Sequence, residues 1–151
     1  GMKLQESMRE ELIRQAFGAL EYAYAPYSKF KVAAALLTKS GKIYTGFNIE
    51  NAALSPGNCA ERTAIFKAVS EGEKDFAAIC IVNEDAQGKH DYCPPCGVCR
   101  QVMMEFCDPG EFRIILAKDE GDYQAYMLAE LLPYGFGPGN LKKQTDDNLV
   151  D

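Results

Sequence analysis

Two short stretches organise this chain: residues 58–62, Asn-Cys-Ala-Glu-Arg, and residues 94–99, Pro-Pro-Cys-Gly-Val-Cys. Cys96 and Cys99 lie three residues apart, so the first turn of a helix can direct both thiols toward one metal ion. Cys59 is the expected third ligand, brought in from a separate helix start. Three protein ligands leave the fourth tetrahedral position for water, which is typical of catalytic zinc. Glu61, two residues after Cys59, is placed to reach that water, and this combination indicates metal-assisted hydrolysis.

Cys93 leaves a second arrangement open. It precedes Cys96 by three residues, so a closed site with four thiolates, as in structural zinc modules, is an alternative. Against it, Pro94 and Pro95 force an extended backbone between the two cysteines, and a closed site gives Glu61 no role. A lone Cys-x-x-Cys is also compatible with a redox function. The open site is the favoured interpretation.

Arg62 is expected to balance the charge of this site. Three thiolates around Zn²⁺ leave a net negative charge, which opposes the activation of a bound water molecule. Arg62 follows Cys59 by three residues, so its guanidinium can donate hydrogen bonds to the sulfurs and tune the metal. The alternative interpretation of this residue is a solvated charge on a helix surface.

The hydrophobic pattern predicts one α/β domain. Alternating strands and helices in the second part of the chain favour a mixed sheet with parallel strands and right-handed crossovers. Ser7 and Glu10 fit a capping box, and Asn58 fits the N-cap of the helix that carries Glu61. Gly46 weakens its strand and marks a close backbone approach. The predicted helices span residues 8–24, 59–71 and 97–106, the predicted strands 30–38, 43–48, 76–83 and 112–117, with a loop at 49–58 and a further strand and helical turn within 122–132.

Length and composition bound the class of protein. The 151 residues suffice for one domain with a core, and 47% hydrophobic with 25% charged residues is ordinary globular composition. No apolar run reaches membrane-spanning length, and no charged and apolar leader opens the chain, so a cytoplasmic location is expected. There, six cysteines favour metal binding over disulfides. The net charge of −6 argues against a nucleic-acid polymer as partner. His90, the single histidine, is predicted to be a surface residue.

Together, the Cys-Ala-Glu and Pro-Cys-x-x-Cys elements resemble the zinc-dependent nucleoside and nucleobase deaminases. Beyond the metal motif, residues 27–32, 46–53 and 131–137 are similar to small cytidine deaminases of the homotetrameric, three-cysteine type, so the resemblance covers nearly the whole chain. It implies a three-layer α-β-α sandwich around a mixed sheet of about five strands. It also implies a cytidine deaminase domain over residues 2–140. The polar composition of the chain end separately predicts a disordered tail over 141–151.

The resemblance assigns a reaction to the metal site. It implies one zinc ion per chain held by Cys59, Cys96 and Cys99, with attack of zinc-bound hydroxide on C4 of the cytosine ring. Glu61 is the implied proton shuttle, which takes the proton of the water and delivers it to the ring and to departing ammonia. The implied products are uridine from cytidine and deoxyuridine from deoxycytidine, a reaction of pyrimidine salvage.

The same resemblance assigns substrate contacts. Asn48 and Glu50 match an Asn-x-Glu element that hydrogen-bonds the ribose hydroxyls, because an amide and a carboxylate together can donate to and accept from them. Phe30 matches an aromatic residue near the base, and Ala60 is assigned to the substrate pocket. Phe136 matches a Phe that reaches into a neighbour's pocket, which implies a homotetramer with shared active sites. From position alone, Phe30 is interpreted as a core strand residue and Phe136 as a cover over its own core.

Three rival functions stay open at this point. A deaminase of the blasticidin type shares the zinc motif but lacks the Asn-x-Glu element, so Asn48 and Glu50 speak against it. A nucleic-acid editing deaminase is disfavoured by the low content of basic residues. A structural zinc or redox module, with Cys93 closing the site, is the alternative outside the enzymes.

Overall fold

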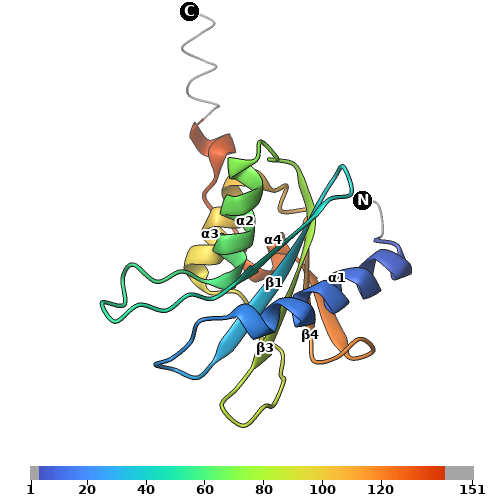
Figure 1. Cartoon of the computed structure of the whole chain (residues 1–151). Coiled ribbons are helices and arrows are strands. Elements are labelled where there is room, and N and C mark those ends of the chain that lie inside the picture. The colour runs from blue at the N-terminus through green and yellow to red at the C-terminus, as the bar shows by residue number, and fades with distance from the viewer. Residues whose placement is uncertain (1–3, 142–151) are drawn as a thin grey trace, which may run out of the picture.

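A single mixed sheet forms the centre of the molecule (Figure 1). The computed structural model describes residues 4–141 of the chain. Within this range the sheet has five strands in the order β2-β1-β3-β4-β5. Strands β3 and β4 are parallel, and the other neighbouring pairs are antiparallel. The strands are β1 (Lys31–Thr38), β2 (Ile43–Phe47), β3 (Phe76–Glu84), β4 (Arg113–Ala117) and β5 (Tyr123–Met127).

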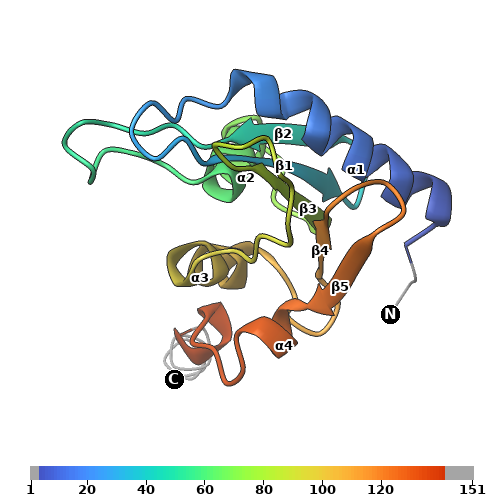
Figure 2. The ribbon, with the colours of Figure 1, turned by 90° about the horizontal axis from the view of Figure 1, so that it is seen from below.

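Helices cover both faces of this sheet. The long helix α1 (Glu6–Ala19) lies across one face, whereas α2 (Ala60–Ser70), α3 (Gly97–Phe106) and the short α4 (Leu128–Leu131) lie on the other (Figure 2). The three-layer α-β-α sandwich and the mixed sheet predicted above are therefore confirmed. No helix within residues 4–141 combines the length and the hydropathy needed to cross a membrane.

The core has two halves, one on each face of the sheet. Leu12, Ile13 and Ala16 recur at helical spacing on α1 and are fully buried against one face. On the opposite face, Ile65 of α2 and Met103 of α3 are equally buried. Strands β1, β3 and β4 are buried along most of their length, because they are covered from both sides. This explains why they appear in the sequence as continuous apolar runs.

Gly46 on β2 allows α2 to lie directly on the sheet. A Cβ atom at this position would be 2.4 Å from the backbone nitrogen of Ala64 and 2.6 Å from the backbone oxygen of Ala60. Only glycine fits so close to a helix backbone. The close approach predicted at Gly46 is thus confirmed, and it fixes the position of the first turn of α2.

Several predicted boundaries are wrong. The first helix ends at Ala19 and passes through a single 3₁₀ turn, because Tyr24 then pairs with the backbone of Asn48 and Glu50 (2.9 and 2.8 Å). Its N-cap is Gln5, without a side-chain hydrogen bond, so the capping box at Ser7 does not form. The second helix has Cys59 rather than the predicted Asn58 as N-cap. Residues 49–58 are not a plain loop, since they contain two isolated β-bridges.

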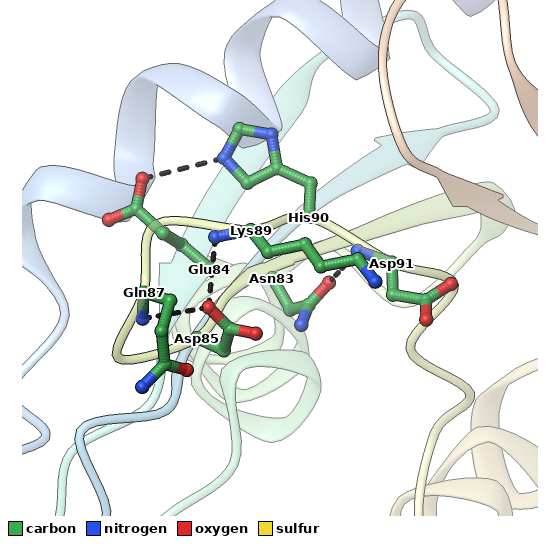
Figure 3. A network of polar contacts seen from close by, with 7 residues as sticks. All are labelled: Asn83, Glu84, Asp85, Gln87, Lys89, His90 and Asp91. Carbon is green, nitrogen blue, oxygen red and sulfur yellow. Dashed lines mark hydrogen bonds and ion pairs between the residues drawn. The ribbon is translucent and has the colours of Figure 1, made fainter.

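Polar contacts shape the segment between β3 and α3 (Figure 3). The buried Asn83 accepts a hydrogen bond from the N–H of Asp91 (2.8 Å), and Asp85 accepts two within its own turn. His90 lies 3.4 Å from Glu84 and its ring packs 5.0 Å from the ring of Phe17 on α1. His90 is at the surface as predicted, with about a third of its side chain exposed, and it also packs against α1.

The predicted tail over residues 141–151 lies outside the described residues, apart from Leu141. That residue belongs to a helical segment at 138–141. The division of the chain at residue 140 stays a prediction.

Candidate active site

Three thiols from two helix starts meet at one point. Cys59 is the residue before α2, Cys96 is the residue before α3, and Cys99 is buried in the first turn of α3. The Sγ atoms of Cys59 and Cys96 lie 3.8 Å apart, those of Cys96 and Cys99 lie 3.5 Å apart, and all three lie within 4.8 Å of one another. Tetrahedral zinc with Zn–S bonds of about 2.3 Å places its sulfurs about 3.8 Å apart. The residues present therefore fit a zinc ion.

The start of α2 and a neighbouring guanidinium favour the thiolate form of Cys59. Unpaired N–H groups and the helix dipole attract negative charge to the two N-termini. Hydrogen bonds from Cys99 and Arg62 lower the pKa of Cys59 to about 5. The Nη2 of Arg62 donates to the Cys59 sulfur over 3.2 Å, and this contact in turn raises the pKa of the guanidinium. The cation that the site needs is thus held against a sulfur.

Glu61 places a carboxyl group beside the thiols, in the first turn of α2. Only 4% of its surface is exposed. Burial raises its pKa to about 7, and the nearby charge of Cys59 acts in the same direction. A carboxyl group with this pKa can take up and release a proton near neutral pH, which general acid–base catalysis requires.

A cleft of about 490 Å³ opens over the three-thiol cluster. Its walls come from residues around the start of β1 (Tyr27, Ser28 and Val32), the segment 48–58, the first turn of α2 and the loop before α3. Asn48, Glu50 and Ala60 line this cleft together with Glu61, so the structure brings these four predicted residues into one space. Two other predicted site residues, Phe30 and Phe136, do not line the cleft. Phe30 is the residue before β1 and is 39% exposed, and Phe136 follows α4 and is 57% exposed.

Asn48 and Glu50 also hold the cleft wall in shape. The amide of Asn48 accepts from and donates to backbone groups beside the start of β1 (2.9 and 2.8 Å). The Glu50 carboxylate accepts hydrogen bonds from the N–H groups of Tyr27 and Ser28 (2.9 and 3.1 Å) and from the Ser28 hydroxyl. The Ser28 hydroxyl has the largest part in lowering the pKa of Glu50, so this side chain is an anion at neutral pH.

Sequence reasoning missed the contacts that join the cleft wall to the metal ligand. Ile49 and Asn58 form a bridge with two backbone hydrogen bonds (3.0 and 2.9 Å), so the segment carrying Asn48 and Glu50 is tied to the residue before Cys59. The Thr63 hydroxyl donates to the Cys59 carbonyl (3.0 Å) and accepts from the Asn58 side chain (3.2 Å). A threonine inside a helix gives no sequence signal for such a role.

Cys93 lines the cleft but does not belong to the three-thiol cluster. The cluster found among residues 4–141 consists of Cys59, Cys96 and Cys99. This geometry fits the open site and not the closed alternative with four thiolates.

Comparisons with known proteins agree with this geometry. Residues 6–113 match the family model for the cytidine and deoxycytidylate deaminase zinc-binding region. The chain is 49% identical over 128 residues to a cytidine deaminase of Halalkalibacterium halodurans, covering 85% of this chain and 93% of that protein. A crystal structure of cytidine deaminase from Burkholderia pseudomallei has a TM-score of 0.75 and 46% identity, covering 83% of this chain and 97% of that one. For the cytidine deaminase of Mycobacterium tuberculosis the TM-score is 0.70 and the identity 32%, covering 89% and 99%. The resemblance noted in the sequence is confirmed, and the chain belongs to the cytidine and deoxycytidylate deaminase family.

Proposed function

We propose that the cleft above the three thiols is where this deaminase converts cytidine and deoxycytidine to uridine and deoxyuridine with release of ammonia. The observation that carries the proposal is the buried Glu61 carboxyl group, with its pKa raised to about 7, beside a three-thiol cluster at the base of one cleft. The site supplies three protein ligands and an acid–base group, which is the set that metal-assisted hydrolysis needs.

The roles of the chain's residues follow from their positions. Cys59, Cys96 and Cys99 hold one zinc ion, which when bound supplies a Lewis acid that activates water for attack on the carbon bearing the amino group. Glu61 accepts a proton from the attacking water, passes it to the ring nitrogen and later protonates the departing amine, so that cytidine and water give uridine and ammonia. Arg62 offsets the negative charge of the three thiolates through its contact with Cys59.

The charges of the cleft favour a nucleoside over a nucleotide. Its described lining contains two acids, Glu50 and Glu61, and a single cation, Arg62, which is already engaged with Cys59. A 5′-phosphate therefore finds no free cation among these residues and meets a carboxylate instead. Asn48 and Glu50 are proposed to bind the sugar hydroxyls, Ala60 to lie against the substrate, and cytidine and deoxycytidine to share the site.

Phe30 and Phe136 are proposed to complete the pocket in a homotetramer. Both lie outside the cleft lining of the single chain, and their rings are 39% and 57% exposed. Tyr134, two residues before Phe136, is fully exposed, and aromatic residues are enriched at protein interfaces. Native mass spectrometry that finds four chains supports this proposal, whereas a fully active monomer contradicts it.

A cytoplasmic location stays a prediction.

The decisive experiment measures turnover and zinc on one sample. Zinc-loaded protein is mixed with cytidine, and the fall in ultraviolet absorbance is followed together with the release of ammonia. We expect equal amounts of uridine and ammonia, activity on deoxycytidine, and little activity on deoxycytidylate. Glu61→Gln should keep the zinc but lose about 10²-fold to 10⁴-fold in turnover. Turnover of blasticidin S but not cytidine, or full activity of Glu61→Gln, overturns the proposal.

A further inference from the structure

A single guanidinium joins the metal-binding loop to the C-terminal part of the chain. Arg100 lies on α3, one residue beyond the ligand Cys99. Its Nε donates a hydrogen bond to the carbonyl oxygen of Pro95 (2.8 Å), and its Nη1 donates to the carbonyl oxygen of Leu131 (2.5 Å). One half-buried side chain therefore contacts two segments that are more than thirty residues apart in sequence.

The Pro95 carbonyl belongs to the residue immediately before the ligand Cys96. Pro94 and Pro95 have no N–H group, so this part of the loop cannot be held by donating backbone hydrogen bonds of its own. Pro95 is buried, whereas Pro94 and Cys96 on either side of it are exposed and line the cleft. Among the described residues, the hydrogen bond from the Arg100 side chain therefore holds the peptide group that leads into Cys96.

The other end of the guanidinium binds a helix terminus. Leu131 is the last residue of α4, and the final carbonyl groups of a helix have no partner within it. The next residue of α3, Gln101, donates from its side chain to the carbonyl of Phe136 (2.9 Å), so two consecutive residues hold the segment after α4 against α3.

We propose that Arg100 is a positioning residue, whose guanidinium fixes the Pro95 carbonyl against the end of α4 and thereby holds Cys96 in place for zinc. The planar guanidinium can donate to two carbonyls in different directions at once, which the single ammonium of lysine reproduces poorly. Arg100 does not line the cleft, so it acts on the metal site through Pro95 and Cys96 and not through substrate.

The test uses zinc release as a readout that does not depend on activity. Zinc-loaded wild type, Arg100→Gln and Arg100→Lys are mixed with a coloured chelator at neutral pH, and the rate of zinc transfer is followed. Gln101→Ala is the matched control, because it removes the neighbouring contact to Phe136 but leaves Pro95 bound. Leu12→Val is the control for general loss of stability, because it perturbs the core on the opposite face of the sheet.

We expect Arg100→Gln to release zinc at least about 10-fold faster than wild type, and Arg100→Lys to fold normally but release zinc nearly as fast as Arg100→Gln. The rate of zinc release from Gln101→Ala and from Leu12→Val should stay within about 2-fold of the wild-type rate. This should hold even if Leu12→Val lowers the melting temperature as much as Arg100→Gln does. If Arg100→Gln does not yield folded protein, Arg100→Lys alone decides the question. Wild-type release from Arg100→Lys, or equal acceleration in Leu12→Val, overturns the proposal.

An activity measurement extends the test and rests on the proposed function. Because Arg100 acts on the position of the metal and not on the substrate, kcat for cytidine should fall about 10-fold in Arg100→Lys while KM stays within about 2-fold. A rise in KM with unchanged kcat contradicts the positioning role. If wild type does not deaminate cytidine but the differences in zinc release persist, the proposed function fails and the role of Arg100 stands.

Discussion

Gly46→Ala tests how the sheet positions the metal site. The added Cβ would lie 2.4 Å from the Ala64 nitrogen and 2.6 Å from the Ala60 oxygen, and both are backbone atoms that no rotamer change can move. Ordinary contact begins near 3.4 Å, so α2 must retreat from β2 by about 1 Å. Overpacking of this kind lowers the free energy of unfolding by about 1–3 kcal/mol. We expect about 3 kcal/mol here, because the clashing atoms belong to the backbone and cannot move aside. For a chain of this size the melting temperature should fall by about 6–12 °C.

The larger effect is expected on turnover. Cys59 and Glu61 flank Ala60 in the first turn of α2, so the displacement that relieves the clash also moves a metal ligand and the proposed proton carrier. Misplacement of reacting groups by about 1 Å can cost about 100-fold in rate. We therefore expect kcat for cytidine to fall about 100-fold in Gly46→Ala, measured from the absorbance change on zinc-loaded protein, with melting followed by calorimetry.

Gly18→Ala is the matched control for this prediction. Gly18 lies inside α1, is exposed, and has no atom within 4 Å of the place where a Cβ would stand. Alanine there should raise stability by about 0.5–1 kcal/mol and leave turnover unchanged. If Gly46→Ala melts within about 2 °C of wild type and keeps its turnover, the close contact between β2 and α2 does not position the site, and this reasoning is refuted.

Three further predictions concern the charges of the site. First, the pKa of Glu61 in the folded chain, about 7, lies above its usual 4.5, so folding takes up a proton between these values and stability falls as the pH rises through this window. In metal-free protein, Glu61→Gln should therefore stabilise the fold by about 3 kcal/mol at pH 8 and by little at pH 4.5, as measured by urea unfolding. Second, in metal-free protein at pH 7 iodoacetamide should alkylate Cys59 first, because its pKa is lowered to about 5, whereas Cys80 and Cys107, whose pKa burial raises to about 12, should resist. Third, Glu50→Gln should raise KM for cytidine about 10-fold or more with little change in kcat, because the carboxylate is proposed to bind the sugar and to hold Ser28.

Each of these predictions has its own contradicting result. A stability difference that does not change between pH 4.5 and pH 8 removes the electrostatic account of Glu61. Equal alkylation of Cys59 and Cys80, read by mass spectrometry, contradicts the lowered pKa of Cys59, and zinc-loaded protein is the control in which Cys59 should be protected. A Glu50→Gln variant with wild-type KM excludes a sugar contact, and Glu71→Gln, on the exposed end of α2, is its control.

Much of the site was readable from the chain because its ligands are close in sequence to strong local signals. Cys96 and Cys99 sit at the start of a helix whose predicted bounds, 97–106, agree with the structure. Gly46 predicted a close contact, and continuous apolar runs predicted the strands β3 and β4. These features depend on spacing and side-chain size, which a sequence displays directly.

The errors have a common physical origin in long-range pairing. Tyr24 continues a helical pattern, yet the chain leaves the helix before it because a backbone partner at Asn48 and Glu50 outweighs local propensity. Asn58 is a good N-cap by type, but its backbone pairs with Ile49, and Cys59 takes the cap position instead. Contacts of this kind join residues that no local pattern relates.

The side-chain contacts around the ligands were also invisible in the sequence. Nothing about Arg100 separates it from an ordinary helix cation until its two carbonyl partners are seen. The amide of Asn48 and the carboxylate of Glu50 were expected to face a sugar, and the structure shows in addition that both are bound to the backbone around Ser28 and β1. Backbone contacts of this kind become apparent only when distant segments are brought together.

X-ray absorption of the zinc-loaded protein tests the central claim most directly, because it counts the atoms around the metal. Three sulfurs from Cys59, Cys96 and Cys99 leave one position for solvent beside the Glu61 carboxyl group. We predict three sulfur neighbours at about 2.3 Å and one lighter neighbour at about 2.0 Å, unchanged in Cys93→Ser. A shell of four sulfurs that becomes three in Cys93→Ser would contradict it.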